Sequence, residues 1–280
     1  MKDNVAEIIR VDLHCHSSAS DGDHSPGYVA HQLAAADCVW AALTDHNSVG
    51  GQESFRAAVQ RRGMQCVTGV EIHARLPRGP VHLLGYGFDP ENEALLSALQ
   101  VLRRPLLEST RQWIGRVFSS GGRATPAVAA DPPADRGQST QHPVDTAEAI
   151  RLVHEAGGLA LLAHPLAGLK TIERLEEFLD WLQPQGLDGI EAFYKLYFRT
   201  TQQQLLEVAE RRGLLTTGGS DFHGLHNHDG TSPGVDMPLE QVERFAAALG
   251  LREEKKLGAC CNDGLSVLRG SAESWRESVD

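Results

Sequence analysis

Short apolar segments that end in histidine or acidic residues recur along this 280-residue chain. The first is the apolar run 8–11, which leads into Asp12, His14 and His16. Alternate side chains of a strand point to the same face, so we expect the imidazoles of His14 and His16 to project together. Two co-directed imidazoles near carboxylates are typical of a metal site, although a pair of surface histidines would give the same pattern.

Strand-like and helix-like patterns alternate along most of the chain. A capping Ser25 before Pro26 predicts the start of a helix, and 39–43 is a continuous apolar run typical of a strand buried on both faces. The predicted strands are 8–11, 39–43, 65–70, 81–87, 158–163, 188–192 and 214–217. The predicted helices are 26–37, 51–62, 92–122, 145–156, 172–181, 200–212 and 239–249. This alternation predicts an α/β fold with a parallel sheet.

The domain organisation predicted is one barrel domain over residues 1–250 with a small helical and loop insertion at 97–144. The insertion begins with an amphipathic helical pattern and continues into 123–144, which is rich in Ala, Pro, Asp and Gly. Residues 251–280 show no clear element and are expected to form a C-terminal tail.

Composition excludes some partners. The formal net charge of −11 argues against a surface that binds nucleic-acid backbone, so extended nucleic acid is not an expected partner. No apolar run is long enough to span a bilayer, and the N-terminus lacks the apolar core of a signal peptide. The five cysteines show no zinc-knuckle spacing, which favours a cytoplasmic location. The oligomeric state stays open.

Polar side chains gather at the carboxyl ends of the predicted strands, the rim where α/β barrels build active sites. Nine of them are candidate metal ligands: His14, His16, Asp21, His46, Glu71, His82, His164, Asp221 and His223. One ion takes about four to six ligands, so this set implies two or three divalent ions. Mixed nitrogen and oxygen ligation suits Mn, Zn or Fe better than Mg or Ca.

These residues form motifs that resemble those of the PHP (polymerase and histidinol phosphatase) family of metal-dependent phosphoesterases. The matching segments are Asp12-x-His14-x-His16, Thr44-Asp45-His46, Gly69-Val70-Glu71, His164 and Ser220-Asp221-Phe222-His223. The resemblance covers 9–90 and 145–235 and is nearest to the stand-alone nucleotide and cyclic-phosphate phosphoesterases. It implies a distorted (β/α)7 barrel that holds three ions. Relatives of this branch carry a larger insertion with a Gly-Arg-Pro-His stretch, so this chain has a shortened cap.

The resemblance also implies how the ligands divide among the ions. One set is His14, His16, Glu71 and Asp221, a second is Asp21, His46 and His223, and a third is Glu71, His82 and His164, with Glu71 bridging. The expected catalytic residues are Asp45, Asp21 and His223. Asp45 is expected to orient a ligand or accept a proton; the alternative is a purely structural hydrogen-bond role. Asp12 is expected to orient an imidazole.

The expected reaction is hydrolysis of a small phosphorylated substrate by a metal-activated water. The substrate is a sugar or nucleotide phosphate, a bisphosphate, or a cyclic phosphate such as ribosyl 1,2-cyclic phosphate. Candidate substrate contacts are His24, Lys195, Arg103, Arg104 and His228, whereas His31, His73, His142 and His154 are expected to be ordinary surface or core histidines.

Three alternatives remain. One is a nucleoside 3′,5′-bisphosphate phosphatase or 5′–3′ exoribonuclease. Another is a non-catalytic PHP binding module, which the complete ligand set disfavours. The third is a C–N hydrolase of the amidohydrolase type, which often uses a lysine on its fourth strand; 158–163 contains none.

Overall fold

The computed structural model describes residues 7–76, 79–103, 144–224 and 231–253. They form one nine-stranded sheet in the order β8-β7-β6-β4-β3-β2-β1-β9, with β5 beside β3. The strands are β1 (Ile8–Cys15), β2 (Trp40–Leu43), β3 (Gln65–Leu76), β4 (Gly79–Tyr86), β5 (Val144–Asp145), β6 (Leu159–Leu162), β7 (Gly189–Tyr194), β8 (Leu215–Gly219) and β9 (Val235–Pro238).

The sheet curls into a barrel because the residues after β8 return to the end of β1. The backbone N–H of Asp221 donates to His14 O (2.8 Å), and that of His16 donates to Phe222 O (2.9 Å). Cys15 and Phe222 form an isolated parallel bridge. The residues that follow β8 are therefore fixed directly beside His14 and His16.

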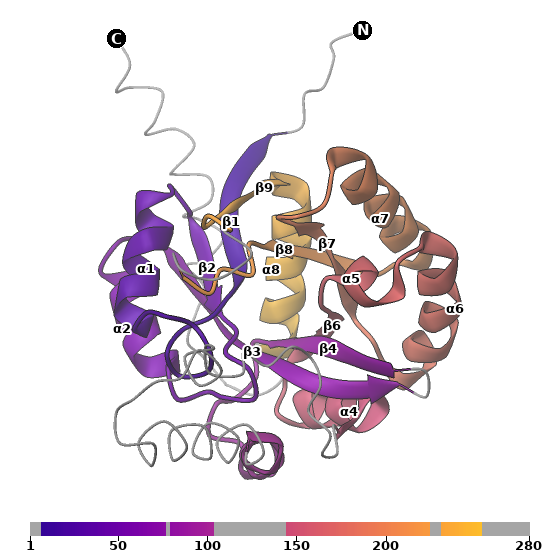
Figure 1. Cartoon of the computed structure of the whole chain (residues 1–280), viewed down its shortest axis with the longest axis horizontal. Coiled ribbons are helices and arrows are strands. Elements are labelled where there is room, and N and C mark those ends of the chain that lie inside the picture. Colours follow the sequence, from indigo (N-terminus) through magenta and orange to yellow (C-terminus); the bar gives the residue numbers. More distant parts are fainter. Residues whose placement is uncertain (1–6, 77–78, 104–143, 225–230, 254–280) are drawn as a thin grey trace, which may run out of the picture.

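Most of the helices lie around the outside of the sheet, and α8 (Leu239–Glu253) lies near the middle of the view (Figure 1). The helices are α1 (Pro26–Ala35), α2 (Gln52–Gln60), α4 (Thr146–Glu155), α5 (Pro165–Leu169), α6 (Ile172–Leu182), the 3-10 turn η1 (Gln183–Gln185), α7 (Arg199–Arg212) and α8. Residues 93–103 are also helical. Ser25 caps α1 as the sequence predicts, because its side chain accepts a hydrogen bond from Tyr28 N.

The α/β class and the barrel are confirmed, but the expectation of a parallel sheet holds only for some of the strand pairs. β3 pairs antiparallel with β4, β4 with β6, and β1 with β9. Only residues 77 and 78 separate β3 from β4 in the sequence, too few for the crossover that a parallel pair needs. The predicted strands included neither β5 nor β9. β7 runs on to Tyr194 beyond the predicted end at Ala192, and α8 runs on to Glu253 beyond Leu249.

Most of the predicted insertion, 104–143, and most of the predicted tail, 254–280, lie outside the described residues. The division into barrel, insertion and tail therefore stays a prediction. Within the described part of the chain, no helix combines the length and the apolar character that crossing a membrane requires.

The core holds the end of β1 in place from both sides. Tyr86 of β4 is wholly buried, packs edge-on against Phe245 of α8, and donates its hydroxyl to Leu13 O (2.7 Å). Gly219 at the end of β8 lies so close to β1 that a Cβ there would be 2.2 Å from His14 Cβ and 2.5 Å from His14 N. The backbone of His14 therefore has little room to move.

Gly219→Ala should reduce the free energy of unfolding by about 1–3 kcal/mol, because the new methyl group meets the backbone of His14 and forces β1 and β8 apart. Chemical denaturation measures the change. Gly27→Ala in α1 is the matched control, since its Cβ would meet nothing within 4 Å, and its stability should stay within about 1 kcal/mol of the parent. Equal stability of the two variants would contradict the tight contact.

Candidate metal centre

The buried carboxylate of Glu71 in β3 lies at the centre of the candidate site. Its Oε2 is 3.1 Å from His14 Nε2, 3.1 Å from His16 Nε2 and 3.2 Å from His46 Nδ1. Its Oε1 is 2.8 Å from His82 Nδ1 and 3.2 Å from His164 Nε2. One carboxylate therefore has five imidazoles around it, from β1, β4 and the segments that follow β1, β2 and β6.

Two further carboxylates complete the cluster. Asp221, after β8, has its Oδ1 3.3 Å from His14 Nε2 and 3.1 Å from His16 Nε2, and its Oδ2 accepts a hydrogen bond from the Tyr194 hydroxyl (3.1 Å). Asp21 comes from the loop between β1 and α1.

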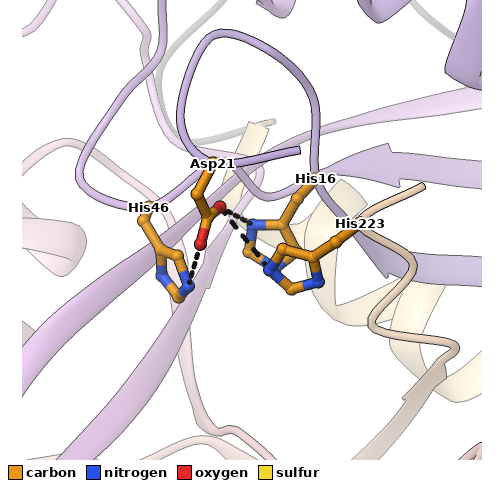
Figure 2. Close-up of side chains that lie close together, drawn as sticks. All are labelled: His16, Asp21, His46 and His223. Atoms are coloured by element: carbon orange, nitrogen blue, oxygen red, sulfur yellow. Dashed lines mark ion pairs between the residues drawn. The ribbon is translucent and has the colours of Figure 1, made fainter. Parts of the chain in front are cut away.

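Figure 2 shows the Asp21 carboxylate with His46 on one side and the rings of His16 and His223 on the other. Its oxygens lie 3.7 Å from His16 Nδ1, 3.7 Å from His46 Nε2 and 3.5 Å from His223 Nε2. The rings of His16 and His223 are stacked, with centroids 4.0 Å apart.

The structure brings all nine candidate ligands together. Within each group, ligand atoms lie within 4.8 Å of one another: His14, His16, Glu71 and Asp221 form one group, Glu71, His82 and His164 a second, and His16, Asp21, His46 and His223 a third. These groups contain the residues that the family resemblance assigns to each ion, with His16 added to the third; the assignment of ligands to ions stays a prediction.

The chemistry of the donor set fits divalent cations. His16 Nδ1, His46 Nδ1 and His82 Nδ1 are buried without a hydrogen-bond partner in the described part of the protein, although carboxylate oxygens lie near them. A buried polar atom left without a partner is costly, and a cation bound to such a nitrogen would satisfy it. Imidazole nitrogens mixed with carboxylate oxygens suit Mn, Fe or Zn.

Neighbouring charges shift the pKa values of the buried cluster residues. Burial by itself raises the pKa of Glu71, but the imidazoles around it, His14 first, hold that pKa well below its usual range. Burial lowers the pKa of His16, yet the carboxylates of Asp221 and Glu71 outweigh burial and raise it to about 10. At His46, by contrast, burial dominates and holds the pKa well below its usual range.

Two other buried aspartates hold the backbone. Asp12 accepts hydrogen bonds from Ser220 Oγ (2.6 Å), Ser220 N (3.0 Å) and Gly234 N (2.8 Å), so it ties β1 to the segments around β8 and β9. Its oxygen also faces the backbone N of His14 (3.4 Å); no contact of Asp12 with the imidazole is seen in the described residues.

Asp45 has a similar position on the other side of β1. Its oxygens accept from Ser17 N (2.7 Å), Ser17 Oγ (2.8 Å) and Ser20 Oγ (2.6 Å). The Ser20 hydroxyl also lies 3.1 Å from Asp21 Oδ1. Asp45 therefore anchors the loop that carries Asp21, and its expected catalytic role stays a prediction.

Glu191 of β7 is a site residue that the sequence reasoning missed. It is wholly buried; its Oε1 lies 2.9 Å from His14 Nδ1 and its Oε2 accepts from His164 N (2.7 Å). A carboxylate on Nδ1 favours the tautomer whose Nε2 is free to bind a metal. The signal was a lone acidic residue inside the apolar run Gly189–Tyr194, since buried charges are rare unless partnered.

His73 of β3 is the second missed residue, because it was expected to be an ordinary surface or core histidine. Its ring centroid lies 4.4 Å from that of His46 and 4.6 Å from that of His82. The three residues form a fourth group that could hold a cation. The available signal was its position two residues after Glu71, which puts both side chains on one face of the strand.

The predicted substrate contacts lie in different places. Arg103 donates to Ala19 O (2.9 Å) in the loop that carries Asp21. The His24 ring lies near Tyr28 and Phe222, at centroid distances of 4.4 and 6.4 Å. Lys195 Nζ donates instead to Gly234 O (2.7 Å) beside β9. Arg104 and His228 fall outside the described residues.

The remaining histidines show no part in the cluster in the described structure. His31 is exposed on α1, and His154 pairs with Asp188 at 2.7 Å, both in line with the expectation of ordinary surface or core positions. His142 lies outside the described residues.

Comparison with solved structures supports the same barrel. The chain superposes with a TM-score of 0.68 and 27% identity on an amidohydrolase from Chromobacterium violaceum solved with sulfate and no metal, covering 84% of this chain and 96% of that one. It superposes with a TM-score of 0.67 and 24% identity on a putative metal-dependent phosphoesterase from Bifidobacterium adolescentis, covering 85% and 95%. The second likeness bears on the fold alone.

Comparison with characterised sequences identifies the family. A 3′,5′-nucleoside bisphosphate phosphatase from Chromobacterium violaceum is 32% identical, over 77% of this chain and 88% of the relative. A phosphoribosyl 1,2-cyclic phosphate 1,2-diphosphodiesterase from Eggerthella lenta is 31% identical, over 76% and 94%. A 5′-3′ exoribonuclease from Haemophilus influenzae is 29% identical, over 76% and 90%. A model of the PHP domain matches residues 12–100. The chain therefore belongs to the PHP family, because relatives above 30% identity cover most of it and a PHP model matches its first cluster motifs.

Proposed function

We propose that the protein hydrolyses a small phosphate ester at the Glu71-centred cluster, with divalent cations as cofactors. The observation that carries the proposal is the buried Glu71 carboxylate with five imidazoles around it. Two relatives above 30% identity are named a bisphosphate phosphatase and a cyclic phosphate diphosphodiesterase. These names confirm the class of reaction that the sequence predicts.

The cations would be held by three sets of ligands. We assign His14, His16, Glu71 and Asp221 to one, Glu71, His82 and His164 to another, and Asp21, His46 and His223 to the third, which makes three ions of Mn, Zn or Fe. Cations held there would neutralise phosphoryl charge and would lower the pKa of water toward neutrality.

The chain's own residues then have distinct tasks. Glu191 orients His14, and Asp45 fixes the loop that brings Asp21 to the cluster. The side chains of Asp21 and His223 are 23% and 15% exposed, much like those of His82, His164 and Asp221, so exposure does not single them out and their catalytic role stays a prediction. Arg103 and His24 adjoin the same loop and are the substrate contacts we retain.

The net charge and the relatives both favour a small substrate. A net charge of −11 opposes binding along nucleic-acid backbone. A sugar phosphate, nucleotide bisphosphate or cyclic phosphate meets this constraint, because it presents one or two phosphates to one pocket. The second candidate is a 5′–3′ exoribonuclease, which the name of the Haemophilus influenzae relative favours.

A reducing, cytoplasmic setting accords with the cysteines of the described chain. Cys15, Cys38 and Cys66 are free thiols, and burial raises the pKa of Cys66 to about 11. Thiols with raised pKa values are poor nucleophiles and resist oxidation.

Chelation should abolish phosphate release, and addition of Mn²⁺ or Zn²⁺ should restore it. The test compares kcat/KM for a panel of phosphomonoesters, a nucleoside 3′,5′-bisphosphate, a ribosyl 1,2-cyclic phosphate and a short 5′-phosphorylated RNA. We expect a small ester to exceed the RNA by at least about tenfold. Preference for the RNA would favour the exoribonuclease, and a metal-loaded protein inert on the whole panel would indicate a non-catalytic module.

Glu191→Gln should weaken metal binding by about 10–100-fold. If the amide oxygen accepts from His164 N, the amide nitrogen faces His14 Nδ1 and reverses the tautomer, so the proton moves to the nitrogen that should bind the metal. Isothermal titration calorimetry measures the affinity. Glu210→Gln on the exposed face of α7 is the matched charge control and should bind metal as the parent does. Unchanged affinity in Glu191→Gln would remove Glu191 from the site.

A further inference from the structure

His73 lies beside two expected metal ligands of the cluster, His46 and His82. Its ring is stacked on that of His82, at an interplanar angle of 23°, and tilted by 52° against that of His46. Ligand atoms of His46, His73 and His82 all lie within 4.8 Å of one another. Three imidazoles thus converge on one volume, and of these only His73 lies outside the nine motif positions.

The backbone fixes this arrangement. His73 and His82 are directly opposite each other in the antiparallel ladder of β3 and β4, so their side chains share a face. His46 and Glu71 form an isolated bridge that joins the segment after β2 to β3. Asn47, next to His46, also binds β3, because its Oδ1 accepts a hydrogen bond from His73 N (3.1 Å).

We propose that His73 is a further metal ligand, which completes a three-imidazole position with His46 and His82 for a nitrogen-preferring divalent cation such as Zn²⁺. Zn²⁺ and Co²⁺ bind three-imidazole sites well, whereas Mn²⁺ favours oxygen ligands. The position shares His46 and His82 with the neighbouring groups, so His73 biases the cluster toward Zn²⁺ rather than adding an isolated site.

The inference rests on metal binding in the proposed function but not on the identity of the substrate. It gives His73 an effect on which cation binds, and packing alone would not have this effect. A histidine that only packs against His46 and His82 would change stability without distinguishing one cation from another.

The test compares the full-length protein with His73→Ser and with His31→Ser, which removes an exposed imidazole from α1. Each is stripped of metal, and its stoichiometry and affinity for Zn²⁺ and for Mn²⁺ are measured by mass spectrometry of bound metal and by calorimetry. The visible absorption of Co²⁺-loaded protein reports the ligands directly. Thermal unfolding of the metal-free forms checks that both variants fold.

We expect His73→Ser to bind Zn²⁺ at least about tenfold more weakly or with lower stoichiometry, to alter the Co²⁺ spectrum, and to keep Mn²⁺ affinity within about twofold. His31→Ser should match the parent throughout. A Zn²⁺ affinity and Co²⁺ spectrum unchanged in His73→Ser would overturn the ligand role while leaving the metal centre intact. Equal losses of affinity for Zn²⁺ and for Mn²⁺ would show that His73 only packs against its neighbours and would overturn its role in metal choice. A parent that binds neither ion would overturn the proposed metal centre as well.

Discussion

The burial of Glu71 among imidazoles is the interaction on which this structure depends. A carboxylate removed from water is costly unless positive charge surrounds it, and here five rings reach its two oxygens. Those rings come from separate parts of the barrel, so the sheet must close before the charge is compensated. Metal binding and folding are therefore expected to be coupled.

The buried aspartates explain how a rim made of loops stays ordered. Asp12 holds Ser220 and Gly234, and Asp45 holds Ser17 and Ser20. Each carboxylate accepts several hydrogen bonds from a loop that carries a cluster residue. The positions of Asp21 and Asp221 are thus set by neighbouring acidic residues that themselves make no described contact with the imidazoles.

The local sequence predicted the cluster better than it predicted the sheet. His46, His164 and Asp221 each follow an apolar strand that the local pattern located. β1 and β3 run on past their predicted ends at Val11 and Val70 to Cys15 and Leu76, so His14 lies within β1. Pairing direction depends on long-range register, so the antiparallel β4 was predicted as a strand but not as a hairpin partner of β3. β9 has only four residues and ends in Pro238, so it has no periodicity to detect.

The two missed site residues have the same physical explanation. Glu191 is a single charged residue in a buried strand, and it contacts the cluster through His14, which is 177 positions away in the sequence. His73 gains its neighbours only when β3 pairs with β4 and the segment after β2 crosses beside it. Spacing along the chain reveals neither contact, because both arise from the closure of the barrel.

The most direct test of the account is anomalous diffraction from crystals of metal-loaded protein, collected on either side of the Mn, Fe and Zn absorption edges. The account predicts three separate peaks next to Glu71, one of them bridged by its carboxylate to a second. A single peak, or peaks that lie away from Glu71 and its five imidazoles, would contradict it.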